Sequence, residues 1–182
     1  MERLQTFDEA GAPLTLEARN KVHALGMWHK SAQVYLFNES GELLIQQRSH
    51  LKDLWGGLWS DSVGEHLSPG ESFEEGAIRG LHEELQVINV KLRRFGEPDR
   101  SDISSGVFVD REFKQAYFAR FDGVVTPDPA EVKSVAWINQ SDFLKKIGAW
   151  RSCFCPSFLI DVDRLDLIAR WNSIVEYLRE RN

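Results

Sequence analysis

The hydrophobic positions follow a strand-like pattern in several short segments. Residues 31–37 (SAQVYLF) are rich in β-forming side chains, and Asn38–Gly41 after them is typical of a turn, so residues 42–47 (ELLIQQ) are the expected hairpin partner. Further strands are predicted from the same pattern over 59–67, 87–95, 113–121 and 132–138. The polar or glycine-containing segments 48–58 and 96–106 are expected to be loops.

Helical spacing occurs in three other segments. One stripe recurs every four residues, at Phe73, Ala77, Leu81 and Leu85. Ser72, followed three residues later by Glu75, predicts a capping box that starts this helix. Ser141 is expected to cap a second helix that runs to about residue 147, and the stretch 158–181 is amphipathic, with apolar positions at Leu159, Val162, Leu165, Ile168, Trp171, Val175 and Leu178. Strands interleaved with helices predict an α/β sandwich.

Composition and charge narrow the classes of partner. The 182 residues carry 22 basic and 28 acidic side chains, a formal net charge of −6. Nucleic acids and anionic membrane surfaces bind clustered Lys and Arg, so no nucleic-acid or membrane partner is expected. Cys153 and Cys155 are too few and too close together for a disulfide framework. With a polar segment 1–5 that does not resemble a secretory signal, these features predict a cytoplasmic protein, either a monomer or a homodimer.

The most informative segment is residues 64–87, GEHLSPGESFEEGAIRGLHEELQV. A Pro-Gly turn leads into the capped helix, on which Glu83 and Glu84 project close together at roughly 100° per residue. Two such carboxylates repel unless a cation lies between them, and oxygen ligands suit Mg²⁺ or Mn²⁺. Arg79 lies four residues from Glu75 and from Glu83 and is placed to orient both. The alternative, a solvated acidic face, is disfavoured by the combination of turn, cap, arginine and glutamate pair.

This segment resembles the Nudix box. The box positions filled as in that family are Glu71, Arg79, Leu81, Glu83, Glu84 and Val87. Three positions differ: Glu65 replaces the first glycine, Gly80 replaces the glutamate after the arginine, and Gln86 replaces the second glycine. The resemblance implies a Nudix-like α/β/α sandwich with a mixed sheet over 29–182, with residues 1–28 as an arm packed on it. It also implies that Glu83 and Glu84 hold metal and that Arg79 orients them for catalysis.

The glutamate that is absent at Gly80 is a metal ligand in the resembled family. Its loss is expected to open space on the face of Glu83 and Glu84 that water, another ligand or a substrate group could occupy. For a hydrolase of the usual kind, Gly80→Glu is then expected to tighten Mg²⁺ binding and to raise turnover. If another group has taken over, the same change is expected to be neutral or harmful.

A second resemblance, in patches from about residue 23 onward, is to the Nudix branch that includes type I isopentenyl diphosphate isomerase. It implies that His23, His29 and His66 converge on a divalent metal, and imidazole ligands favour Mn²⁺ or Zn²⁺ over Mg²⁺. Of the later glutamate pair only Glu112 is near its place, because the Glu-x-Glu spacing is absent. The essential cysteine of that isomerase would fall at Gly64, so isomerisation lacks an acid there.

Candidate groups for the substrate lie outside the box. In the isomerase-like arrangement Arg48 and Lys52 flank the loop that faces the box, and either could contact phosphate oxygens; solvated loop charges are the alternative. Glu131 matches a glutamate that follows the box in many Nudix proteins and could act as a base, or it could be a surface carboxylate.

These observations support three hypotheses for function. The first is a metal-dependent Nudix-type hydrolase that cleaves a diphosphate linkage, in a nucleoside diphosphate or a related X-diphosphate, with Mg²⁺ or Mn²⁺ as cofactor. The second is a catalytically impaired protein of the same fold that binds a small-molecule diphosphate, motivated by Gly80. The third is an isomerase-like enzyme, which Gly64 disfavours. We rank them in that order.

Overall fold

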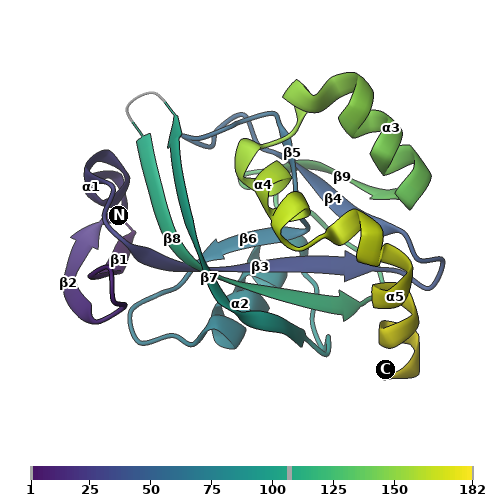
Figure 1. Cartoon of the computed structure of the whole chain (residues 1–182), viewed down its shortest axis with the longest axis horizontal. Coiled ribbons are helices and arrows are strands. Elements are labelled where there is room, and N and C mark those ends of the chain that lie inside the picture. The colour runs from purple at the N-terminus through teal and green to yellow at the C-terminus, as the bar shows by residue number, and fades with distance from the viewer. Residues whose placement is uncertain (1, 106–107, 182) are drawn as a thin grey trace.

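The computed structural model describes residues 2–105 and 108–181. Within these residues a mixed seven-stranded sheet runs through the centre of the molecule (Figure 1). Its strands are β3 (His29–Phe37), β4 (Leu43–Arg48), β5 (Trp59–Ser60), β6 (Val63–His66), β7 (Arg93–Ser105), β8 (Phe108–Arg120) and β9 (Val132–Ile138). The order β5-β4-β3-β8-β7 is extended by β6, which pairs with β3, and by β9, which pairs with β4. Only β3 and β8 pair in parallel among these strands.

Helices cover both faces of the sheet. Helix α2 (Phe73–Leu85) lies behind it in Figure 1, and α3 (Gln140–Trp150), α4 (Pro156–Arg164) and α5 (Leu167–Glu180) lie on the other side. Side chains alternate along a strand, so β3 serves two cores. Val34 and its alternates pack with α2, whereas Tyr35 and Phe37 pack with α4 and α5. The predicted α/β sandwich with a mixed sheet is confirmed.

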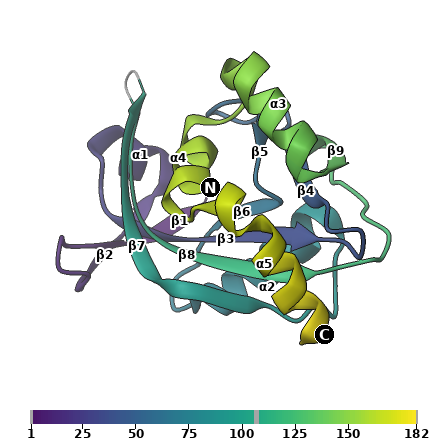
Figure 2. The ribbon, with the colours of Figure 1, turned by 45° about the vertical axis from the view of Figure 1, so that its right-hand side comes forward.

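The N-terminal segment packs at one end of the sheet. It contains the hairpin of β1 (Arg3–Phe7) and β2 (Pro13–Ala18) and the short helix α1 (Arg19–Leu25), grouped at one side in Figures 1 and 2. Helix α1 ends at Gly26 in the left-handed conformation, with φ 60°. A Cβ there would lie 2.7 Å from Cγ1 of Val109, so only glycine lets α1 end this close to β8. This close contact fixes the position of His23 on α1.

The edge of the sheet differs from the prediction. Strand β7 covers most of the segment expected to be a loop over 96–106 (Gly106 lies outside the described residues), and only the end of the strand expected over 87–95 belongs to it. It pairs with β8 from Arg93↔Phe118 to Ser105↔Phe108. An edge strand tolerates polar side chains because one of its sides faces water. A polar edge strand therefore resembles a loop in the sequence.

Strand β4 pairs with β3 over a shorter length than the sequence pattern predicts. The two strands pair only at Phe37↔Leu43, and β4 pairs along its length with β9 instead. Ser62 lies between β3 and β4: its Oγ accepts a hydrogen bond from Leu36 N at 2.8 Å and donates to Leu44 O at 2.6 Å. It also interrupts the strand expected over 59–67, which becomes β5 and β6.

The three predicted helical segments are present but differ at two boundaries, and α1 was not predicted. The capping box of Ser72 and Glu75 on α2 is confirmed. Helix α3 is capped by Asn139, whose side chain accepts from Asp142 N at 2.9 Å, and not by Ser141. The amphipathic C-terminal stretch is two helices, because Asp166 adopts a left-handed conformation with φ 49°. Among the residues of known conformation, no helix is long and apolar enough to cross a membrane.

Candidate active site

A cavity of about 560 Å³ is lined by residues of β3 and β8 and, at one end, by residues of α4. The alternation that directs Tyr35 and Phe37 toward α4 and α5 places His29, Ser31 and Gln33 on the same face of β3. On β8 the corresponding face carries Asp110, Glu112 and Lys114, and the parallel register sets His29 beside Glu112 and Ser31 beside Lys114. One sheet face is thus polar at the cavity and apolar under the helices.

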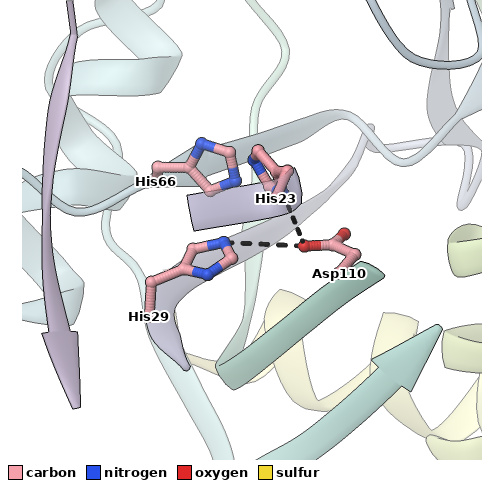
Figure 3. Close-up of side chains that lie close together, drawn as sticks. All are labelled: His23, His29, His66 and Asp110. Carbon is pink, nitrogen blue, oxygen red and sulfur yellow. Dashed lines mark ion pairs between the residues drawn. The ribbon is translucent and has the colours of Figure 1, made fainter. Parts of the chain in front are cut away.

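The three predicted histidines converge at this cavity (Figure 3). His23 comes from α1, His29 from β3 and His66 from β6, and their ring centroids lie 4.8–5.2 Å apart. Asp110 joins them, with Oδ1 at 3.4 Å from Nδ1 of His23 and 3.5 Å from Nε2 of His29. One potential ligand atom from each of the four residues lies within 4.8 Å of all the others. We call His23, His29, His66 and Asp110 the histidine cluster.

The chemistry of the histidine cluster fits a metal ion. Both ring nitrogens of His23, Nε2 of His29 and Oδ1 of Asp110 are buried and have no hydrogen-bond partner in the described part of the chain. Burial, with the charge of His66, lowers the pKa of His29 to about 4, so the ring is neutral at pH 7. Its Nδ1 lies 3.0 Å from the carbonyl of Met27, which can only accept, so Nε2 presents a lone pair to the carboxylate. Two acceptors that face each other need a cation between them.

Glu112 borders the histidine cluster. Its Oε1 lies 3.6 Å from Nε2 of His66 and 3.8 Å from Nε2 of His29, while Oε2 lies 3.4 Å from Nζ of Lys114. Sequence reasoning named Glu112 but missed Asp110, because it looked for two glutamates. The signal was present as an aspartate two residues before Glu112, since alternate residues of a strand share a face.

Arg79 ties the glutamates of α2 to the neighbouring turn and strand. Its guanidinium donates to both carboxylate oxygens of Glu71 at 2.9 Å, to Oε2 of Glu83 at 3.1 Å and to the carbonyl of His66 at 2.8 Å. The expected contact with Glu75 is not among its partners, because the carboxylate of Glu75 accepts hydrogen bonds from Ser72 in the capping box. Arg79 therefore orients Glu83 and Glu71.

Glu83 and Glu84 both line the cavity, in different surroundings. The side chain of Glu83 is 55% exposed, whereas Glu84 is buried and accepts a hydrogen bond from Nε2 of Gln46 at 2.8 Å. Burial, reinforced by the charges of Glu65 and Glu131, raises the pKa of Glu84 to about 8 despite the Gln46 bond. A bound cation would favour its charged form. The glutamate face, as we call Glu83 and Glu84 with Glu71 and Arg79, thus presents oxygen ligands of the kind Mg²⁺ and Mn²⁺ take.

The space expected beside Gly80 is absent. A Cβ on Gly80 would lie 2.8 Å from Cγ1 of Val63 and 2.9 Å from Cβ of Glu65, because α2 packs directly on β6 there. The expectation of open space for water or a substrate group is therefore wrong. By the same geometry Gly80→Glu would collide with β6, so we no longer expect that change alone to improve the site.

The predicted phosphate-binding side chains, Arg48 and Lys52, lie in the same cavity as the glutamate face. Arg48, Lys52 and Glu131 all line the cavity. Lys52 forms an ion pair with Glu131 through Nζ and Oε2, and Nε of Arg48 donates to the carbonyl of Leu54 at 3.2 Å. Glu131 is thus a member of the cavity wall, although its role as a base stays a prediction.

The inner end of the cavity is charged, which the sequence did not indicate. Nζ of Lys114 lies 3.0 Å from Oδ2 of Asp161 on α4. Asp61 accepts a hydrogen bond from Ser60 at 2.7 Å, and a Cβ on Gly64 would lie 3.5 Å from its Oδ2. Burial raises the pKa of Asp61 to about 6; Ser60, Lys114 and nearby Arg48 oppose this shift and Asp161 adds to it. The position that would hold a thiol therefore faces a carboxyl group.

Several known proteins resemble this chain over most of its length. A family model described as the NUDIX domain matches residues 27–158. The isopentenyl-diphosphate Delta-isomerase of Paenarthrobacter aurescens (strain TC1) is 34% identical over 160 residues, 85% of each chain. The protein of that name from Burkholderia multivorans is 30% identical over 172 residues, 93% of this chain and 97% of the relative. The crystal structure of DR0079 from Deinococcus radiodurans matches with a TM-score of 0.69 over 93% of this chain and 98% of that chain; at 22% identity the match concerns the fold alone.

Proposed function

The chain belongs to the NUDIX domain family, and on that premise we propose that it is a metal-dependent hydrolase cleaving a diphosphate linkage to a polar leaving group. The observation that supports this most is the mixed charge of the cavity lining. Carboxylates able to hold cations, among them Glu83, Glu84 and Glu112, line the same cavity as the basic side chains Arg48 and Lys52. A diphosphate needs both, because its charge is divided between cations and basic side chains.

The side chains have separable tasks in this proposal. A divalent cation, when bound, neutralises phosphate charge and makes water a better nucleophile. Glu84 and Glu83 hold cations at the glutamate face, and His23, His29, His66, Asp110 and Glu112 hold one in the buried part of the cavity. Arg79 is a positioning residue, because its guanidinium is hydrogen-bonded to Glu83 and Glu71.

In this proposal Arg48 and Lys52 bind the substrate, and Glu131 accepts a proton. Lys52 and Arg48 bind oxygens of the diphosphate. When Lys52 turns to phosphate, Glu131 loses its ion-pair partner and accepts the proton of the attacking water. The water oxygen then bonds to phosphorus, the bridging P–O bond breaks, and the leaving group departs with that electron pair.

An isomerase is the second candidate. It is favoured by the names of the two relatives and by Asp61, whose carboxyl could exchange a proton beside Gly64 at neutral pH. The inner end of the cavity opposes it, because the buried Lys114–Asp161 ion pair offers an isopentenyl chain few apolar contacts. A leaving group rich in hydroxyl or amino groups suits this end of the cavity better.

The test is a panel of diphosphates incubated with Mg²⁺ or with Mn²⁺, in which the phosphorylated products of cleavage, phosphomonoesters or free phosphate, are identified by anion-exchange chromatography. The panel contains nucleoside diphosphates, nucleoside diphosphates linked to sugars, and isopentenyl diphosphate, whose rearrangement is followed by proton NMR. We expect cleavage of polar diphosphates and its loss in Glu84→Gln. Rearrangement of isopentenyl diphosphate without cleavage would replace the proposal with the isomerase, and saturable binding without any turnover would replace it with a diphosphate-binding protein.

A further inference from the structure

Glu65 and Gly80 are in direct contact across two elements. Glu65 is on β6 and Gly80 is in the middle of α2, and the Cβ that Gly80 lacks would lie 2.9 Å from Cβ and 3.1 Å from Cγ of Glu65. The side chain of Glu65 therefore passes over α2 at Gly80, where the helix carries no side chain. Glycine in a helix interior is unfavourable by about 0.5–1 kcal/mol relative to alanine, so close packing and not helix stability explains Gly80.

Compared with the Nudix box, the residue types at positions 65 and 80 are exchanged in this chain. That pattern has glycine where Glu65 stands and glutamate where Gly80 stands. Because the two positions touch, the exchange keeps one glutamate and one glycine within the same small volume. The difference is the element from which the carboxylate comes.

The carboxylate of Glu65 lies in the cavity beside the glutamate face. Its side chain is only 16% exposed, and both Glu65 and Glu84 line the cavity wall. Its nearest cationic partner in the described chain is Arg79, with Nη1 at 3.2 Å from Oε1.

Arg79 does not balance this charge. The same Nη1 donates to Glu83, and the rest of the guanidinium is used by Glu71 and by the carbonyl of His66. One guanidinium thus serves Glu65, Glu71 and Glu83, while Glu84 has only the amide of Gln46. Partly buried carboxylates in excess over cationic side chains are the donor set that takes a divalent cation.

We propose that Glu65 supplies, from β6, a carboxylate for the divalent cation held by Glu83 and Glu84, in place of the side chain that α2 lacks at Gly80. This inference rests on the proposed function, because it assigns a ligand to the same site. It predicts that residues 65 and 80 act as a coupled pair: a glutamate is required at one of them and a glycine at the other.

The experiment measures Mn²⁺ affinity of the full chain by electron paramagnetic resonance, after one equivalent of Zn²⁺ has been added to occupy the histidine cluster. Glu65→Gln is the main variant, because it removes the charge and keeps the shape. Glu74→Gln removes the same charge from an exposed position of α2 and is the matched control. We expect Glu65→Gln to weaken Mn²⁺ binding by about 10-fold or more, and the control to leave it unchanged.

Reciprocal variants test the coupling. Glu65→Gly is expected to lose Mn²⁺ affinity, and Gly80→Glu to lower Tm because its side chain collides with Glu65. The double variant, Glu65→Gly with Gly80→Glu, removes the collision with Glu65 but not the one with Cγ1 of Val63, so Mn²⁺ affinity is expected to recover toward the wild-type value and Tm only in part. Unchanged affinity in Glu65→Gln would overturn the inference, and so would a folded double variant that binds Mn²⁺ no better than Glu65→Gly.

Failure of this inference is distinguishable from failure of the proposed function. If the wild-type protein hydrolyses a member of the diphosphate panel and Glu65→Gln still binds Mn²⁺ normally, the inference is wrong and the function stands. If the wild-type protein hydrolyses nothing but Glu65→Gln has lost Mn²⁺ affinity, the function is wrong and Glu65 is still a ligand.

Discussion

The histidine cluster and the glutamate face share one cavity but are built in opposite ways. The cluster collects residues from α1, β3, β6 and β8, separated by up to 87 positions along the chain (23 to 110), and buries nitrogen and oxygen atoms that have no hydrogen-bond partner. The glutamate face comes from one helix and its preceding turn, within 14 residues (71 to 84), and its carboxylates are hydrogen-bonded to Arg79 or Gln46.

Because the two regions differ in whether their polar atoms have hydrogen-bond partners, we expect metal binding to affect the stability of the fold differently in each. A buried polar atom without a partner destabilises a protein by about 1–3 kcal/mol, so the histidine cluster is strained without a cation and gains stability on binding one. The glutamate face keeps its geometry through its own hydrogen bonds, so a cation there acts on substrate chemistry more than on folding. We therefore expect the two regions to respond differently to mutation and to metal removal.

The largest effect is expected from Glu84→Gln. Loss of this buried carboxylate should lower kcat for diphosphate hydrolysis by about 10³-fold, within the range seen for essential groups that act on proton transfer or metal. Because the amide still bonds to Gln46, Tm should change little. Steady-state kinetics beside thermal unfolding would check this, and a fall in Zn²⁺ affinity of the histidine cluster would contradict the separation of the two sites.

Removal of a cluster ligand should affect metal binding and stability together. His29→Ala is expected to weaken Zn²⁺ binding by well over about 100-fold, since loss of an outer hydrogen-bond partner alone weakens metal binding by about 10–100-fold. The rise in Tm that Zn²⁺ gives the wild-type protein should disappear. Calorimetric titration measures the affinity, and His50→Ala, at an exposed histidine, is the control. An equal Zn²⁺-dependent rise in the His29→Ala variant would show that the cluster is not the site.

Asp61 belongs to neither region, and its pKa shows the effect of burial on a carboxylate in this cavity. Burial raises its pKa from 3.8 to about 6, so the folded protein binds this proton more tightly than the unfolded chain. That contribution is full at low pH and is lost as pH rises toward 6. Asp61→Asn stays neutral and should raise the free energy of unfolding by about 2–3 kcal/mol at pH 8. Near pH 4 the change should be small.

Denaturant unfolding at the two pH values checks this prediction. Asp53→Asn, at an exposed aspartate of the neighbouring loop, is the comparison that removes a charge without removing a buried one. Equal effects of Asp61→Asn at both pH values would mean that the carboxyl is not protonated more readily in the folded protein.

The smallest effect is expected from Ser72→Ala, which removes the cap of α2. Loss of a side-chain cap lowers stability by about 1 kcal/mol. The glutamate face depends on α2, whereas the histidine cluster lies on other elements, so Mn²⁺ affinity should fall slightly and Zn²⁺ affinity should not. Urea unfolding and the two metal titrations measure the three quantities. Equal weakening of both metals would mean that α2 supports the cluster as well.

What the sequence predicted follows the same division. The cap, the apolar stripe and the contact between Arg79 and Glu83 are local properties of one helix, and they could be predicted from spacing. The convergence of His23, His29 and His66 was predicted only through resemblance, because no local pattern links α1, β3 and β6. Asp110 was missed although it alternates with Glu112, and Asp161 could not be placed before the position of α4 was known.

Gly80 shows where local reading fails. In the sequence Gly80 stands where the Nudix box has a glutamate, and the absence of that side chain suggested open space beside the helix. In the fold its neighbour is Glu65, 15 positions earlier (80 minus 65), and that neighbour fills the space. The prediction of a loop over 96–106 failed for a related reason. The polar residues of β7 are typical of a loop, and only the pairing with β8 shows that they form a strand. Both errors concern partners that are distant along the chain.

Ser62 has a consequence for how the cavity is held together. It joins β3 and β4 where these strands stop pairing, so the sheet forks there, as Figure 1 allows the reader to follow. One branch, β3 with β6, carries His66 and Glu65; the other, β4 with β9, leads to Arg48 and Glu131. These two groups of cavity residues thus lie on separate branches of the sheet, and the buried hydroxyl of Ser62 hydrogen-bonds to both branches where they meet.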